Sequence, residues 1–267
     1  MTVSRTWRAR LGAVTWLLLA AVSAAACGDG LTGPARAREN AAAPSCTDWS
    51  TGAPVPCGVD ARGPGGGRVF HDAGSLQPWG QYLEVAPQGW NGALHDCPGT
   101  RWWTGSGCEY AAPAEDGTSD FGPDPDSGYR ICGPTAAGYR GGTDTAIGSG
   151  RTNTATLLAD PGCTTGEVSA LTLATAYDGG GYTDWYLPSL DEMTALCRYG
   201  GLDTIGGFPN KGSYATSSAH QSGDTEFFDV LRFDRGSKKQ PCPSADWPNP
   251  PAKGDRAPLG VRPIRSF

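Results

Sequence analysis

The chain has 267 residues, a formal net charge of −6, 18% charged residues and 40 glycines. This length suits one large domain or two small ones. The negative charge argues against a general nucleic-acid-binding protein, which would carry a basic face. Abundant glycine with few charges favours a loop-rich fold of short strands over long amphipathic helices.

The first 27 residues predict an export signal. Three arginines precede Leu11–Ala26, an uncharged apolar stretch that is short for a membrane span. It ends in three alanines before Cys27, and small residues before a cysteine are typical of bacterial lipoproteins. We therefore predict that Cys27 is lipidated and anchors the chain to a membrane. Ordinary cleavage at the alanine-rich site is the alternative.

Cysteine usage supports an oxidising compartment. Without Cys27 eight cysteines remain, an even number that allows four disulfides, and no CxxC motif indicates a metal or redox site. The disulfide candidates are Cys46, Cys57, Cys97, Cys108, Cys132, Cys163, Cys197 and Cys242. Proximity favours Cys46 with Cys57 and Cys97 with Cys108, but the sequence leaves the full pairing open.

Four segments follow from composition. Residues 1–27 are the signal, 28–45 a flexible tether rich in Gly, Ala and Pro, 46–62 a small lead-in, and 63–267 the main domain. The glycines of Gly63–Gly67 could suggest a phosphate loop. No Gly-Lys-Ser/Thr follows them, so they predict a turn into a strand.

Short apolar runs bounded by turn residues predict strands at 68–71, 82–87, 214–218, 227–233 and 261–267. We expect a turn at Asp72–Gly74. The last strand must pair within a sheet to be ordered at the chain end. Arg262 and Arg265 alternate only loosely with apolar neighbours, so we expect at least one to be exposed.

Two helices are expected before the central motif. One follows 147–154, with Thr152 or Asn153 as its N-cap, and the other covers about 167–177.

The central motif reads strand, hinge, capped helix. Its structural residues are Asp184, Trp185, Leu187, Pro188, Ser189 and Glu192. The run 185–187 suits a short buried strand, which Pro188 ends. Ser189 and Glu192 have the spacing of a capping box for a helix ending near Gly200. We expect Asp184 to hydrogen-bond a turn and Trp185 to fill the core.

A long irregular region covers residues 88–145. It holds Trp102-Trp103 and an acidic run at Asp120, Asp124 and Asp126. Calcium is one interpretation of the acidic run, but its spacing fits no EF-hand loop, and a solvated turn is favoured. We predict no metal site and no cofactor.

Several separated blocks resemble the C-terminal domain of the Legionella collagen-like adhesin family. These blocks are Gly65–Phe70, Tyr82–Pro87, Ile147–Thr154, Gly180–Ser189 and Val261–Phe267. The resemblance spans about 63–267. It implies an α+β, C-type-lectin-like fold with short antiparallel strands, two or three short helices and long disulfide-stapled loops. It also implies surface export, binding of sulfated glycosaminoglycan and a homotrimer.

The sequence also departs from that family. No collagen-like repeat precedes the domain, which removes one driver of trimerisation. The domain is acidic overall, which weakens the expectation of a polyanionic ligand.

Motifs for catalysis are missing. None of the three histidines lies in HExxH, and no GxSxG elbow is present. The resemblance also reaches formylglycine-generating enzymes, which use reactive cysteines, but the even cysteine number favours disulfides.

Two surfaces are candidates for ligand binding. One is the basic set Arg232, Arg235, Lys238 and Lys239, whose cationic groups suit sulfate or carboxylate. The other is Arg101, Trp102 and Trp103, since exposed aromatics stack on sugars or anchor proteins. A solvated hairpin and a small disulfide-backed core are the respective alternatives.

We therefore predict an exported, lipid-anchored, non-catalytic surface protein that binds a glycan or a surface protein. The rival hypothesis is a structural envelope protein that binds another protein of the same cell.

Overall fold

The computed structural model describes residues 44–90, 102–104, 107–109, 131–132, 141–163, 169–208, 211–222, 225–234, 242, 244–249 and 259–267. Residues Ala43–Phe267 form one compact unit. The predicted signal, the lipidation site Cys27 and nearly all of the tether lie outside the described residues.

The lead-in forms a small two-stranded sheet. Strand β1 (Ser45–Thr47) pairs antiparallel with β2 (Pro54–Pro56), and a disulfide joins Cys46 to Cys57, as predicted. Isolated bridges then connect Thr47 to Arg62, and Arg62 to Arg68 at the start of β3. The lead-in is thereby hydrogen-bonded to the first strand of the main domain.

A second sheet has the order β10-β4-β3. Strand β3 (Arg68–Gln77) and β4 (Gly80–Val85) form a hairpin, and β10 (Ile264–Ser266) adds to the other edge of β4. The expected turn at Asp72–Gly74 is wrong. Gly74, which has a positive φ, lies within an irregularity of the β3–β4 pairing between Asp72 and Gln77. The strand continues through this irregularity, and the chain reverses only after Gln77.

The helices occupy the middle of the chain. They are α1 (Gly150–Ala159), α2 (Ala170–Ala176), the 3₁₀ turn η1 (Gly179–Gly181), α3 (Leu190–Arg198) and α4 (Leu202–Ile205). The capping box of α3 is confirmed, since Ser189 Oγ accepts the Glu192 amide and Glu192 accepts the Ser189 amide.

Two other helix starts differ from expectation. Helix α1 is flanked by Ser149, not by Thr152 or Asn153, because the Asn153 side chain is used to bind the backbone of Asp144. Helix α2 begins at Ala170, later than expected, since Ser169 and Thr172 form its capping box.

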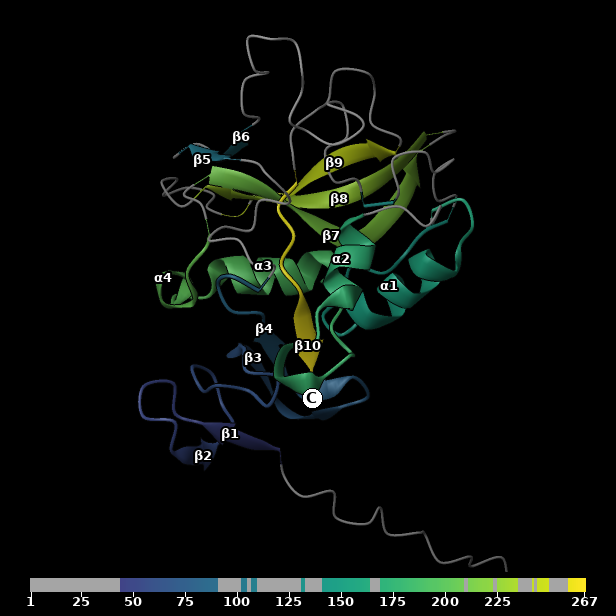
Figure 1. The fold of residues 1–267 in the computed structure, drawn as a ribbon. Coiled ribbons are helices and arrows are strands. Elements are labelled where there is room, and N and C mark those ends of the chain that lie inside the picture. The colour runs from purple at the N-terminus through teal and green to yellow at the C-terminus, as the bar shows by residue number, and fades with distance from the viewer. Residues whose placement is uncertain are drawn as a thin grey trace, which may run out of the picture. The chain divides into compact units, whose positions relative to one another are not determined.

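The third sheet has the order β7-β8-β9. It comprises β7 (Lys211–Ser222), β8 (Thr225–Asp234) and β9 (Ser244–Asn249), all antiparallel. A separate hairpin joins β5 (Trp102–Thr104) to β6 (Gly107–Glu109). Figure 1 shows the helices between the β7–β8–β9 sheet and the β3–β4–β10 sheet, and α3 contacts strands of both.

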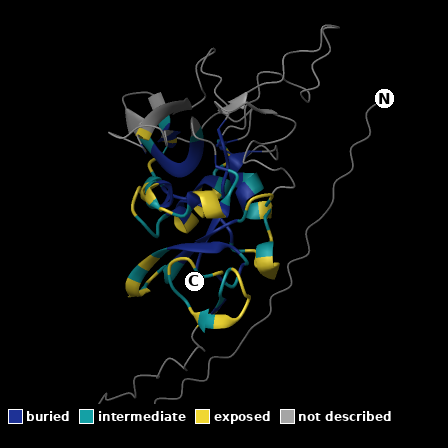
Figure 2. Ribbon diagram, turned by 90° about the vertical axis from the view of Figure 1, so that its left-hand side faces the viewer, coloured by how far each residue is buried: buried dark blue, intermediate teal, exposed yellow. Residues whose placement is uncertain are grey.

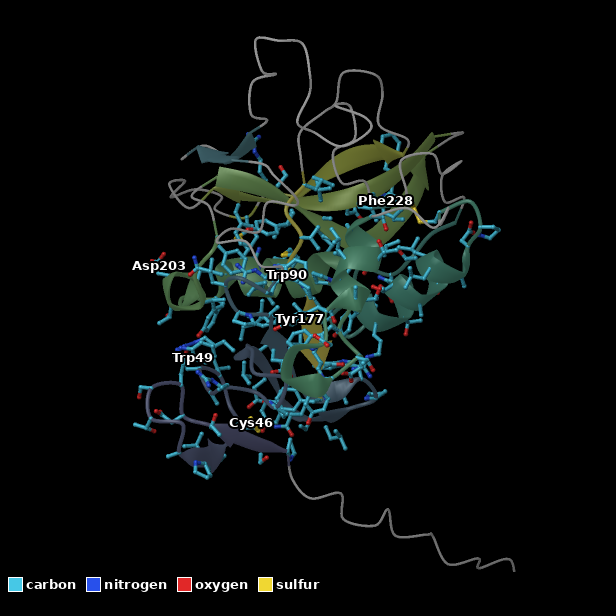
Figure 3. All side chains as sticks on the ribbon, viewed as in Figure 1. Cys46, Trp49, Trp90, Tyr177, Asp203 and Phe228 are labelled. Carbon is cyan, nitrogen blue, oxygen red and sulfur yellow. A yellow bond between two sulfur atoms is a disulfide. The ribbon has the colours of Figure 1, made fainter. Side chains whose placement is uncertain are left out.

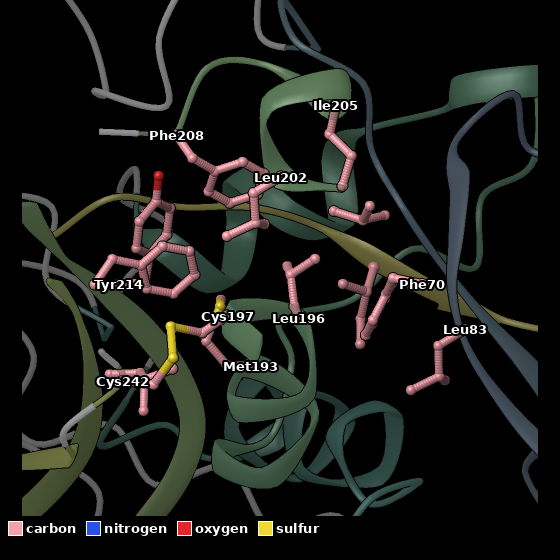
Figure 4. Close-up of a cluster of buried hydrophobic side chains, with 14 of the residues drawn as sticks. Phe70, Leu83, Met193, Leu196, Cys197, Leu202, Ile205, Phe208, Tyr214 and Cys242 are labelled. Carbon is pink, nitrogen blue, oxygen red and sulfur yellow. A yellow bond between two sulfur atoms is a disulfide. The ribbon is translucent and has the colours of Figure 1, made fainter. Parts of the chain in front are cut away.

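Figure 2 shows that buried residues occupy the interior of the described part of the chain, and one cluster of them lies where α3 meets the two sheets. Phe70 and Leu83 come from one sheet, Met193 and Leu196 from α3, and Tyr214 from the other sheet (Figure 4). The disulfide between Cys197 and Cys242 lies in this cluster. The described molecule is therefore a mixed α+β fold with short antiparallel strands, few helices and disulfides.

Candidate functional site

The run 185–187 of the central motif is buried, but it does not form the predicted strand. Trp185, Tyr186 and Leu187 are at most 2% exposed, and only Tyr186 makes a β-bridge, to Ile264 of β10. The Trp185 ring meets the edge of Tyr177 at 4.8 Å, and Tyr177 meets Trp90 at 5.7 Å. Figure 3 labels Tyr177 and Trp90 of this row. Trp185 thus fills the core, as expected.

Asp184 pairs with two arginines, where the sequence had predicted a turn contact. Its carboxylate accepts from Arg265 Nε, and from Arg151 Nη2 at 3.0 Å. Arg265 Nη1 also donates to Glu84 at 2.8 Å, and these two residues lie directly opposite each other in the β10–β4 register. A chain of alternating charges therefore runs from the buried Glu84 to the half-exposed Arg151.

The expectation that Arg262 or Arg265 is exposed is wrong. Arg262 is 0% exposed, and Arg265 is 7% exposed. The guanidinium of Arg262 donates to the carbonyls of Ala86 and Gly206 and lies 4.1 Å from the centre of the Phe208 ring. Fixed backbone acceptors replace water for this cation, which is why it can be buried.

The glycines near residue 65 make room for Glu84. A Cβ at Gly65 would lie 2.6 Å from Glu84 Oε1, and one at Gly63 would lie 2.2 Å from Oε2. The Gly65 amide donates to that carboxylate at 3.0 Å. This loop therefore holds a carboxylate of its own chain at the point where the sequence had excluded a phosphate loop.

Two buried glutamates have perturbed acidities. Burial raises the pKa of Glu84, and the hydrogen bond and charge of Arg265 partly oppose that shift. Burial also raises the pKa of Glu192, opposed by the amides of Ser189 and Gly148. Both carboxylates are fully buried, so each is stabilised only by partners within the protein.

The charge chain reaches the surface at a group that we call the carboxyl-terminal rim, which comprises Tyr82, Arg151, Tyr182, Asp184 and Phe267. The Tyr182 ring is stacked on the Arg265 guanidinium at 3.7 Å, and the rings of Tyr82 and Phe267 lie 5.5 Å apart. Tyr182 is 36% exposed. The side chains of Arg151 and Asp184 are 46% and 40% exposed.

Neighbouring groups hold the rim in place. Arg151 Nη2 donates to the backbone oxygen of Ser266 at 3.0 Å as well as to Asp184. The backbone oxygen of Phe267 accepts from the amides of Gln81 and Tyr82. The rim therefore offers aromatic rings, a guanidinium and a carboxylate, all half-exposed and fixed in position. Sequence reasoning missed it, although its members lie inside or beside the quoted blocks.

The predicted binding residues are only partly described. Arg232 is exposed on β8, opposite Ser213 of β7. Arg235, Lys238, Lys239 and Arg101 lie outside the described residues, as do the side chains of Trp102 and Trp103 in β5. The structure therefore places neither predicted surface as a group.

The structure defines three of the cysteine pairs. Besides Cys46–Cys57, disulfides join Cys132 to Cys163 and Cys197 to Cys242. Cys97 and the side chain of Cys108 lie outside the described residues. The three observed disulfides confirm that cysteines act as staples in this fold.

The acidic, histidine and cysteine side chains of the described residues are dispersed. Within the described ranges, no three His, Cys, Asp or Glu side chains gather closely enough to hold a metal ion. The acidic run at Asp120, Asp124 and Asp126 lies outside those ranges. His220 Nδ1 lies 3.3 Å from the Asp229 carboxylate, and its ring is stacked on Phe227.

Comparison with family models, with curated proteins and with solved structures finds no match to this chain. Among the described residues, no helix has the length and apolarity needed to cross a membrane.

The raised pKa of Glu84 predicts a pH dependence of stability. When the folded-state pKa of a carboxyl exceeds its unfolded value, the folded chain binds protons more tightly between the two values. The contribution of Glu84 to the free energy of unfolding should therefore rise as the pH falls from 7 towards 4.5, the ordinary pKa of a glutamate, below which the unfolded chain also takes up the proton.

Urea denaturation at pH 7, 6 and 5 checks this prediction. Glu84→Gln should show a flatter profile than the wild type, and parallel profiles would contradict the assignment. The contribution of Asp48 to stability falls as the pH falls, opposite to that of Glu84, because hydrogen bonds from Ser50 and Thr51 lower the pKa of Asp48 from 3.8 to about 2. The effect of Asp48 is confined to lower pH. Burial lowers the pKa of His71, which opposes the effect of Glu84 within the tested window but does so equally in the wild type and in Glu84→Gln.

Proposed function

We propose that this chain is an exported, lipid-anchored surface protein without catalytic activity, whose C-type-lectin-like domain binds a glycan through the carboxyl-terminal rim. The observation that carries the proposal is the half-exposed Tyr182 ring beside the fixed pair Arg151–Asp184. The lipid anchor at Cys27 and the C-type-lectin-like fold are parts of the same proposal.

Sugar recognition suits this chemistry. The C–H face of a sugar packs against an aromatic ring, while its hydroxyls need donors and acceptors at defined positions. Arg151 supplies donors and Asp184 supplies acceptors, and each holds the other at 3.0 Å. Because these side chains are already ordered, binding would lose little side-chain entropy.

The fold gives this proposal indirect support. The last strand, β10, pairs with β4, so two of the blocks that carry the resemblance, Tyr82–Pro87 and Val261–Phe267, lie side by side in one sheet. Antiparallel strands, short helices and disulfides agree with the features that the resemblance implied.

A glycan array carrying neutral and sulfated sugars tests the proposal, with the oxidised full chain applied in the presence and absence of EDTA. Tyr182→Ala should weaken binding roughly tenfold, the equivalent of about 1.4 kcal/mol. The matched control Tyr182→Phe keeps the ring and should bind within about threefold of the wild type.

Two outcomes would redirect the assignment. If sugar binding depends on Arg232 but not on Tyr182, the ligand site is on the β7–β8–β9 sheet. If folded protein binds no sugar on the array, a protein partner becomes the better hypothesis.

A further inference from the structure

Two arginines face each other where the lead-in joins the main domain. The Val69 amide donates to the Ala61 carbonyl at 2.9 Å, and the Gly63 amide donates to the Gly67 carbonyl at 2.8 Å. These bonds flank the bridge between Arg62 and Arg68, which is therefore a non-hydrogen-bonded pair. Side chains approach most closely in such a pair, and like charges there repel each other.

A tryptophan ring holds both cations. The guanidinium carbon of Arg62 lies 4.6 Å from the centre of the Trp49 ring, and that of Arg68 lies 5.0 Å from it. Trp49 follows Thr47, which pairs with Arg62, so the same ladder that aligns the arginines brings the ring to them. Figure 3 shows where Trp49 lies on the lead-in.

The charges at this place are not balanced. Asp60 is the nearby carboxylate, 3.7 Å from Arg68 Nε, and it also accepts from the Tyr199 hydroxyl. Among the described residues, no carboxylate oxygen lies within 4.0 Å of the Arg62 guanidinium. Asp60 therefore pairs with Arg68 alone, and its side chain is 66% exposed.

Arg68 also has an unused donor. The residue is 7% exposed, and its Nε donates to Tyr199 Oη at 3.1 Å. Within the described part of the chain, its buried Nη1 donates to no acceptor. A buried cationic donor without an acceptor is unfavourable, and an anionic oxygen beside it would remove that cost.

We propose that Arg62, Arg68 and Trp49 form a binding site for a phosphate group, either free phosphate or the phosphate of a lipid headgroup. A phosphate oxyanion can accept from two guanidinium groups at once and cancels their repulsion. Arg62 is exposed, so an anion can reach it from solvent and would then lie beside Arg68 across the bridge. This site is separate from the carboxyl-terminal rim and adds to the proposed function.

Isothermal titration of the full chain in detergent tests the site, with inorganic phosphate as the probe at low salt. Arg62→Gln removes one exposed cation and should weaken phosphate binding at least tenfold. Arg198→Gln is the matched control, since it removes an exposed cation next to Tyr199 in sequence and should change affinity less than twofold. Phosphate should also shift the Nε–Hε resonance of Arg68 in the NMR spectrum.

A second arm separates the two sources of phosphate. Vesicles of phosphatidylglycerol are compared with vesicles of phosphatidylcholine in a flotation assay. If the chain floats with phosphatidylglycerol vesicles alone, and Arg62→Gln does not, the site binds lipid headgroups. If the chain binds inorganic phosphate in the titration but floats with neither kind of vesicle, the site binds free phosphate. Absence of both, or equal losses in Arg62→Gln and Arg198→Gln, overturns the proposal.

Discussion

Arg265→Met should destabilise the fold by about 3–5 kcal/mol, the range for breaking one partner out of a buried ion pair. The substitution keeps most of the side-chain volume but removes the cation that faces Glu84 and Asp184. Glu84 is 0% exposed and would keep only backbone donors from the glycine loop. Urea denaturation monitored by circular dichroism at pH 7 measures the loss.

A double-mutant cycle separates the ion pair from simple packing. Glu84→Gln alone should reduce the free energy of unfolding by less than Arg265→Met does, because Arg265 would still be paired with the Asp184 carboxylate. The double variant should be more stable than the sum of the single losses predicts, by about 1 kcal/mol or more, since no buried charge is left unpaired. Arg232→Met, an exposed arginine on β8, is the control and should cost less than about 0.5 kcal/mol. A loss below about 1 kcal/mol for Arg265→Met would mean that Glu84 is already neutral at pH 7.

This ion pair illustrates what sequence reasoning could not reach. Arg265 and Glu84 are 181 residues apart, and nothing local to either marks the other as its partner. The pattern around Arg265 suggested exposure, because an arginine that alternates with apolar residues normally faces water. Burial became possible only when β10 aligned beside β4 and brought the two charges into register.

Local chemistry was more predictable. The Cys46–Cys57 pair and the Ser189–Glu192 capping box involve residues close in sequence, and the structure contains both. Asn153 shows the limit of such rules. It is a good N-cap type, yet its side chain joins α1 to the backbone of Asp144, and Ser149 flanks the helix instead. Capping propensity gives the average preference of a residue type, but it takes no account of other backbone groups in the fold that compete for the same side chain.

The carboxyl-terminal rim lies between these two cases. Tyr182 and Asp184 both lie in the block Gly180–Ser189, where their proximity is visible in the sequence. Arg151, Phe267 and Tyr82 come from three distant segments that only the fold brings together. The sequence pointed instead to the basic and tryptophan-rich stretches, because charge and aromatic clusters stand out when they are consecutive.

Glu192→Ala should cost about 2–4 kcal/mol of unfolding free energy, because one buried carboxylate satisfies three donors. Glu192 accepts from the Ser189 amide at 2.8 Å, from the Gly148 amide at 2.9 Å and from the Tyr186 hydroxyl at 3.3 Å. The first contact caps α3, while the other two hold the loop before α1 and the buried central motif. Thermal denaturation followed by circular dichroism measures the effect.

Two control variants separate these roles. Asp191→Ala removes an exposed acid from the same first turn and should cost less than about 1 kcal/mol, since only the helix dipole is affected. Glu192→Gln can still complete the capping box, but its amide group presents a donor to either Ser189 or Gly148, so an intermediate loss is expected. If Glu192→Ala costs no more than Asp191→Ala, then Glu192 is only a helix cap, and the loop at Gly148 is held by other contacts. A loss several times larger means that a motif visible in four consecutive residues also joins two distant parts of the fold.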